Sequence, residues 1–189
     1  MTLILASRSP QRRAILEQLG IEFEVVAPDA EELTGGDPRT TVVENALRKA
    51  RAVAGELVLA CDTEVVLDGE VFGKAADEPQ AEAFLRRLSG RTHEVWGGLA
   101  LRRGAEERTA HAVTTVRFRQ LAEAEIAWYL GTGEWRERAG AYAIQGLGAV
   151  LVERIDGDFW NVVGLPVPQL VDLFGGQWTA PRRRGSALG

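Results

Sequence analysis

The first twenty residues contain the segment that most constrains the fold of this chain. Leu3-Ile4-Leu5-Ala6 is a short apolar run typical of a buried strand. Pro10 stands where a first helical turn would begin, Ser9 before it is a natural N-cap, and Gly20 follows the last apolar position at helical spacing. The segment therefore predicts a strand, a tight loop and a helix.

The N-terminus of this helix is expected to bind an anion. Unpaired N–H groups and the helix dipole favour negative charge there. Side chains that add charge or hydrogen-bond donors surround it: Ser7, Arg8, Ser9, Arg12 and Arg13. Two glycine-rich segments near the other end, 139–146 and 163–166, suggest that a phosphate site is assembled from both ends of the chain. An ordinary capped helix with a solvated basic face is the alternative that this segment alone leaves open.

Composition narrows the class of protein. The 189 residues are 46% hydrophobic and 26% charged, which is typical of a soluble globular protein, and a cytoplasmic location without membrane association is expected. Cys61 is the single cysteine and His93 and His111 the two histidines, so any metal should be a hard ion held by oxygens. The net charge of −5 argues against stable nucleic-acid binding.

The hydrophobic pattern predicts a mixed α/β fold, with a central twisted mixed sheet flanked by helices and two closely packed lobes. Asp68-Gly69 is a strong hairpin signal between two short strands. We expect one domain over residues 1–178 and a disordered tail over 179–189. Strands are predicted near 22–26, 57–60, 65–67, 70–72, 94–102, 109–119 and 148–155, and later helices near 43–54, 81–88, 126–130 and 166–174.

Charged residues at the ends of apolar runs are the candidates for chemistry. Asp62 follows the run 57–60, where the strand is expected to end, and open α/β sheets bind ligands at such ends. Lys74 follows the predicted hairpin, within plausible reach of Asp62. Carboxylates and cations together suit a phosphate ester bridged by Mg²⁺. Each residue also has an ordinary interpretation, since a lone Asp often forms a turn and a Lys often ends a hairpin.

The acidic loop from Pro28 to Pro38 and the helix after it supply further candidates. Glu31 and Glu32 lie in the loop, and which of them is nearer a metal is left open. Lys49 lies on the helix, where a solvated face is the commoner role for such a residue.

An ordered set of motifs resembles the Maf family of nucleoside triphosphate pyrophosphatases, first linked to inhibition of septum formation. The resemblance runs from about Leu3 to Phe174. The motifs are Leu5-Ala6-Ser7-x-Ser9-Pro10-x-Arg12, Lys49-Ala50, Asp62-Thr63, Leu67-x-Gly69-Glu70-Val71-x-Gly73-Lys74, Leu88-Ser89-Gly90-x-Thr92-His93-x-Val95, Ala139-Gly140-Ala141-Tyr142-x-Ile144-Gln145-Gly146, Ile155-x-Gly157-Asp158 and Val163-Gly164-Leu165-Pro166.

This resemblance implies hydrolysis of a nucleoside triphosphate to the monophosphate and pyrophosphate by a homodimer of the Maf and inosine-triphosphatase-like fold. It implies a divalent cation, Mg²⁺ or Mn²⁺, bound by Glu31 and Asp62, with Asp62 as the proton acceptor. The residues that it assigns to the triphosphate are Ser7, Ser9, Arg12, Lys49 and Lys74.

The resemblance also bears on the base. One branch of the family acts on dTTP and UTP and carries Arg, Thr and Gln at three positions; a second acts on 7-methyl-GTP and carries Trp, Gln and Glu. This chain has Gln11, Thr63 and Gln145 there. Two of the three match the first branch, so dTTP and UTP are the expected substrates, with Gln11 as the departure.

A second function is kept as the alternative: a nucleotide-binding regulator of cell division without significant turnover. Such a binder would need the cations but not the aspartate. The joint presence of Glu31, Lys49, Asp62 and Lys74 therefore favours an enzyme.

Overall fold

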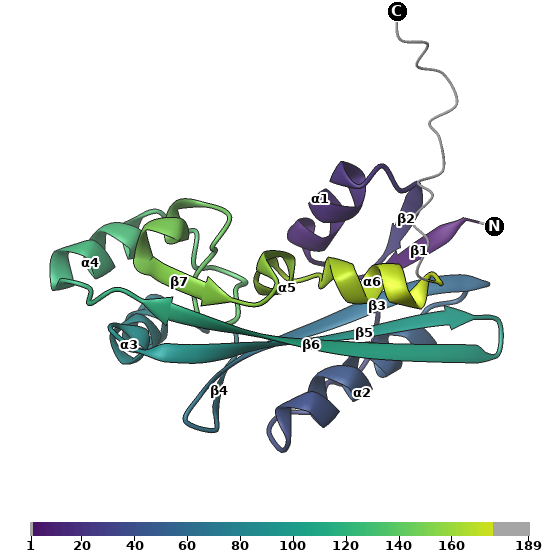
Figure 1. Ribbon diagram of the computed structural model, residues 1–189, viewed down its shortest axis with the longest axis horizontal. Coiled ribbons are helices and arrows are strands. Elements are labelled where there is room, and N and C mark those ends of the chain that lie inside the picture. The colour runs from purple at the N-terminus through teal and green to yellow at the C-terminus, as the bar shows by residue number, and fades with distance from the viewer. Residues whose placement is uncertain (1, 176–189) are drawn as a thin grey trace, which may run out of the picture.

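The computed structural model describes residues 2–175, which alternate between strands and helices (Figure 1). The strands are β1 (Leu3–Ala6), β2 (Phe23–Val26), β3 (Leu57–Leu67), β4 (Glu70–Phe72), β5 (Thr92–Arg103), β6 (Glu106–Phe118) and β7 (Val152–Asp156). The helices are α1 (Pro10–Gln18), α2 (Pro38–Arg51), α3 (Glu78–Leu88), α4 (Glu123–Gly131), α5 (Phe159–Val163) and α6 (Val167–Leu173), with a 3₁₀ turn η1 (Leu147–Leu151).

The described strands form one seven-stranded sheet in the order β2-β1-β3-β5-β6-β7, with β4 paired to β3. β1 is parallel to β2 and β3, whereas the pairs β3–β4, β3–β5, β5–β6 and β6–β7 are antiparallel. The expected α/β fold with a mixed sheet flanked by helices is thus confirmed. The predicted hairpin joins β3 to β4, and Asp68 (φ 52°) and Gly69 (φ 78°) both have the positive φ that a type I′ turn requires.

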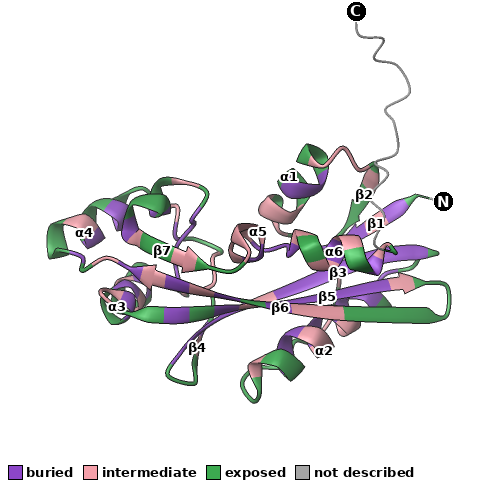
Figure 2. Ribbon diagram, in the orientation of Figure 1, coloured by how far each residue is buried: buried purple, intermediate pink, exposed green. Residues whose placement is uncertain are grey.

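Helices cover both faces of the sheet, and the core is divided accordingly. Small residues on α2 pack against Val58, Ala60 and Ala100 on one face, whereas α1 and α6 cover Leu59 and Leu99 on the other. A larger apolar cluster at the far end of the sheet includes residues of α3, α4 and η1. The long β5–β6 hairpin extends along the sheet from the lobe that contains α1, α2 and α6 to the lobe that contains α3 and α4, and so joins the two (Figure 1). Figure 2 shows that buried residues follow β3 and β5, while β2 at the sheet edge is largely exposed.

The structure corrects the expected end of the strand before Asp62. β3 continues without a break from Leu57 to Leu67 and pairs with β5 from Leu57 to Val66. The prediction failed because the polar triplet 62–64 interrupts the apolar pattern without interrupting the strand. What does end there is the parallel pairing with β1, whose last partner on β3 is Ala60.

The strand predicted over 148–155 is also only partly correct, since residues 147–151 form the turn η1 and β7 begins at Val152. The Glu134 carboxylate accepts hydrogen bonds from the backbone N–H groups of Leu147 (3.0 Å) and Gly148 (2.9 Å). Two successive N–H groups directed at one side chain are incompatible with a strand.

The described residues include no helix that is both long and apolar enough to span a membrane. The tail predicted over 179–189 lies outside the described residues.

His93 should make folding sensitive to acid. It is buried, its Nε2 lies 2.9 Å from the Tyr142 hydroxyl, and burial lowers its pKa to about 4. The unfolded chain gains this proton near pH 6.5, so the contribution of His93 to stability is complete above that pH and is lost as the pH falls toward 4. Its size is at most about 3 kcal/mol.

Urea denaturation of the wild type and of His93→Gln between pH 5 and pH 8 measures this contribution. The glutamine amide can still bond to Tyr142 but does not titrate. We expect the free energy of unfolding to fall less steeply with decreasing pH in the variant. Equal slopes for the two proteins would exclude His93 as the cause.

Candidate active site

The candidate site lies at a break in one edge of β3. β5 occupies the opposite edge along almost its full length, whereas this edge pairs with β1 at Val58–Ala60 and with β4 at Val65–Leu67. Among the described strands, none pairs with this edge over Cys61–Glu64. Ser7 follows the end of β1 and Lys74 follows the end of β4. These two strands flank the break (Figure 1).

Side chains alternate across a strand, so the break presents two different faces. Cys61 packs on the side of α1 and α6, and Thr63 faces the same way. Asp62 and Glu64 face α2. Burial raises the pKa of the Cys61 thiol to about 11, so it stays protonated and is a poor nucleophile.

On the α2 face, Asp62 is buried and paired with a lysine. Lys49 Nζ donates to Asp62 Oδ1 at 2.7 Å, and both side chains are less than a tenth exposed. Gly98 allows α2 to lie close enough to the sheet for this contact. It is the register partner of Asp62 on β5, and a Cβ at this position would overlap with the carbonyl group of Val42 in α2.

Asn45, which the sequence analysis did not single out, orients Asp62 and secures the acidic loop. Its Nδ2 donates to Asp62 Oδ2 at 2.9 Å and to the Leu33 carbonyl at 3.1 Å, and its Oδ1 accepts from the Leu33 N–H at 2.7 Å. The signal was present in the sequence. Asn45 stands four residues before Lys49, on the same side of a predicted helix, where an isolated amide is unexpected.

The acidic loop brings Glu32 to this cluster. The Glu32 carboxylate lies 3.0 Å from Lys49 Nζ. Glu31 is exposed, and its main-chain carbonyl accepts a hydrogen bond from Arg48 Nη1 at 3.3 Å. The structure therefore brings Glu32 to Lys49 and Asp62, while a metal role for Glu31 stays a prediction.

Glu64 is the second residue that the sequence analysis missed. It is 8% exposed and lies two residues beyond Asp62, on the same face of β3. Burial, followed by the negative charges of Asp62 and Glu32, raises the pKa of Glu64 to about 7, although Lys49 opposes the shift. Its Oε2 is buried without a hydrogen-bond partner among the described residues. In the sequence it stands beside the apolar run Val65-Val66-Leu67 and gave no sign of being part of the site.

This donor set suits a hard divalent cation. Glu32, Asp62 and Glu64 supply carboxylate oxygens, the ligands that Mg²⁺ and Mn²⁺ prefer, and one buried oxygen of Glu64 is unpaired. The described residues contain no preformed group of three or more ligand side chains. Mg²⁺ usually takes one or two carboxylates together with substrate phosphates.

On the opposite face, Arg12 joins three parts of the chain. Its Nε donates to the Gly164 carbonyl at 2.9 Å, its Nη2 to Thr63 Oγ1 at 3.0 Å and its Nη1 to Ser7 Oγ at 3.3 Å. Arg12 and Gly164 thus bring the two ends of the chain together, while phosphate binding there stays a prediction. A rigid guanidinium beside two hydroxyls has the geometry to bind phosphate oxygens.

Ser9 and Gln11 lie at the start of α1. Ser9 is the N-cap, as predicted, and its Oγ accepts from the Arg12 N–H at 3.5 Å. The same hydroxyl donates to Gln11 Oε1 at 2.9 Å, which fixes the Gln11 amide beside the helix N-terminus.

Two of the predicted residues are not in contact with these clusters. Lys74 is exposed and forms an ion pair with Glu137 at 2.7 Å, and among the described residues it makes no hydrogen bond to Asp62. Gln145 is exposed in the loop before η1. Their roles at the site stay predictions.

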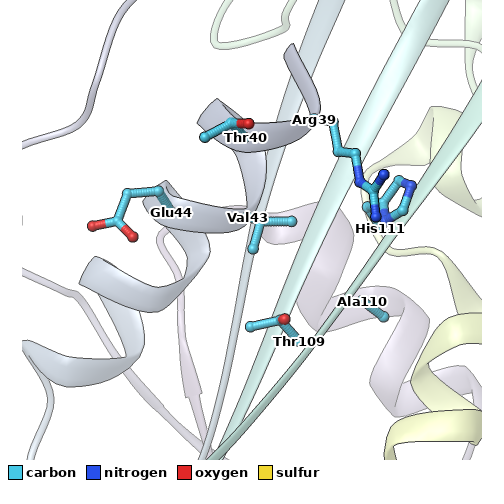
Figure 3. Close-up of a pocket in the computed structure, with 7 residues that line it drawn as sticks. All are labelled: Arg39, Thr40, Val43, Glu44, Thr109, Ala110 and His111. Carbon is cyan, nitrogen blue, oxygen red and sulfur yellow. The ribbon is translucent and has the colours of Figure 1, made fainter. Parts of the chain in front are cut away.

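A separate hollow of about 330 Å³ lies on the outer side of α2, against β6 (Figure 3). Arg39 and His111 both line it. Asn45 and Lys49 are on the inward side of the same helix, so α2 separates this hollow from Asp62. None of the predicted site residues lines it.

The chain matches the family model described as "Maf-like protein" over residues 2–176. A dTTP/UTP pyrophosphatase of Symbiobacterium thermophilum is 51% identical over 177 residues, covering 90% of this chain and 91% of the relative. One of Thermus thermophilus is 49% identical over 172 residues, covering 90% and 92%. Among solved structures, the Staphylococcus aureus Ham1 protein aligns with a TM-score of 0.46 at 17% identity, over 62% of this chain and 72% of that one. With a family match over nearly all of its length and relatives near 50% identity, the chain belongs to the Maf-like protein family.

Proposed function

We propose that the chain hydrolyses nucleoside triphosphates, dTTP and UTP above others, to the nucleoside monophosphate and pyrophosphate. The observation that carries the proposal is the break at Cys61–Glu64, where the arginine and hydroxyl groups on one face of β3 adjoin the carboxylates and lysine on the other. The curated relatives named dTTP/UTP pyrophosphatase support the choice of substrate.

In this proposal, the cations bind the triphosphate. Arg12 and Ser7 contact phosphate oxygens, with Arg12 giving bidentate contacts. Lys74 exchanges Glu137 for phosphate, at little cost because an exposed ion pair contributes at most about 1 kcal/mol. These positive charges stabilise the departing pyrophosphate.

Asp62 accepts the proton from the attacking water. The water oxygen forms a bond to the α-phosphorus, and the bond from that phosphorus to the bridging oxygen of the pyrophosphate breaks. Lys49 and Asn45 each hold one oxygen of Asp62, which fixes the carboxylate for this role. A divalent cation at Asp62 and the acidic loop would neutralise phosphate charge and make water more acidic. On the family resemblance we also propose a cytoplasmic homodimer that uses Mg²⁺ or Mn²⁺.

A substrate panel tests the function. The purified protein is incubated with canonical and modified nucleoside triphosphates and Mg²⁺, Mn²⁺ or chelator, and pyrophosphate and monophosphate are measured separately. Equal release of both products from dTTP or UTP, abolished by chelator, is the expected result. Silence across the panel, from protein shown to be folded, would favour a nucleotide-binding regulator of cell division.

Gln11→Arg should shift the substrate profile toward dTTP and UTP. The branch that acts on these nucleotides carries arginine at this position, and an arginine adds a positive charge that the Gln11 amide lacks. The measurement is kcat/KM for dTTP and UTP relative to the purine nucleotides. An unchanged ratio would exclude this position as a selector in this chain.

A further inference from the structure

Glu64 is a buried residue whose carboxylate is not fully hydrogen-bonded. Its Oε2 is buried and has no hydrogen-bond partner among the described residues, although a buried polar group without a partner is costly. Asp62, two residues earlier on the same face, has both oxygens engaged, by Lys49 and Asn45. Each Asp62 oxygen therefore keeps one free lone pair, whereas the buried Oε2 of Glu64 has no partner at all among the described residues.

The charges around Glu64 indicate what it could bind. When ionised, Glu32, Asp62 and Glu64 carry three negative charges, against the one positive charge of Lys49. A divalent cation would balance the remaining two. The Cα atoms of Asp62 and Glu64 are about 6.6 Å apart along an extended strand, so two flexible carboxylates can converge on one ion.

We propose that Glu64 is a ligand of the divalent cation, which it shares with Asp62 and with the phosphates of the bound nucleotide. The inference rests on the proposed function. Because Mg²⁺ and Mn²⁺ usually take only one or two carboxylates when phosphates complete the shell, the ion binds tightly only together with the nucleotide.

Binding of Mn²⁺ tests this assignment without turnover. The probe is Mn²⁺ with and without the α,β-imido analogue of UTP, and free Mn²⁺ is measured by its electron paramagnetic resonance signal. In Glu64→Gln we expect the affinity for Mn²⁺ in the presence of the analogue to fall about 10- to 100-fold, a loss seen even when an outer partner of a metal is removed. Glutamine keeps the shape of the side chain and removes its charge.

Glu153→Gln is the matched control. Glu153 lies on β7, which β5 and β6 separate from β3, is exposed and accepts a bond from Arg117 Nε at 3.0 Å. Removing its charge should leave Mn²⁺ affinity within about twofold, since exposed charges at a distance are screened. Equal Mn²⁺ affinity in Glu64→Gln and the wild type would overturn the assignment, and so would equal losses in the two variants. The proposed function is judged separately, by hydrolysis in the wild type.

Glu64→Cys distinguishes direct ligation from loss of charge. A thiolate is a soft ligand, so this variant should gain affinity for Cd²⁺ with the analogue while losing affinity for Mn²⁺. Ligand-to-metal charge-transfer absorption should accompany Cd²⁺ binding above the level in the wild type, whose single cysteine is the buried Cys61. Absence of both the Cd²⁺ gain and the absorption in folded Glu64→Cys would contradict direct coordination.

Discussion

Asp62→Asn is expected to lower kcat for dTTP hydrolysis about 10³-fold, the size of effect that removal of a general base produces. The amide cannot accept the proton from water, and it presents no negative charge to a cation. The measurement is single-turnover release of pyrophosphate and monophosphate with Mg²⁺ present.

Folding and binding controls accompany this variant. Lys49 loses one partner but keeps Glu32 at 3.0 Å, so we expect the free energy of unfolding to fall by about 1 to 3 kcal/mol without loss of the fold. Calorimetry should still detect binding of the α,β-imido analogue. Asp172→Asn, an exposed site in α6, serves as the matched change and should retain full activity. Normal turnover by Asp62→Asn would remove Asp62 from the mechanism.

Arg12→Lys is expected to lower kcat/KM about 10²-fold, although the positive charge is kept. Arg12 reaches Gly164, Thr63 and Ser7 through three different nitrogens, and a lysine ammonium cannot reproduce that fork. Both the contact to phosphate and the positions of the two hydroxyls should therefore suffer. Steady-state kinetics with dTTP and UTP provide the measurement.

Arg13→Lys is the natural comparison. Arg13 lies on the same helix, is exposed and pairs with Glu17 at 2.8 Å, so its replacement should change kcat/KM less than twofold. Similar losses in the two variants would indicate a general effect of charge or of helix stability. A loss confined to Arg12→Lys supports a specific contact.

The sequence predicted the parts of the fold that depend on local rules. The Ser9 cap, the helix opening at Pro10 and the hairpin at Asp68-Gly69 each follow from the conformation of one or two residues, and each is present. The mixed α/β class followed from the alternation of apolar periods along the chain.

Features that depend on distant segments could not be predicted in this way. Whether β3 ended at Asp62 was decided by pairing with β5, more than thirty positions later in the chain. The choice of Glu32 over Glu31 at Lys49 depends on how Asn45 holds the loop at Leu33. Local propensity contains no information on either contact.

The break in the edge of β3 also has a consequence for aggregation. An unpaired strand edge ordinarily invites a strand from another molecule to add to the sheet. Here the open edge spans only Cys61–Glu64, about 13 Å of backbone, and β1 and β4 close it at either end. A foreign strand would collide with both neighbours before it could pair. The chain can therefore leave polar backbone open to a small ligand without offering a template for self-association.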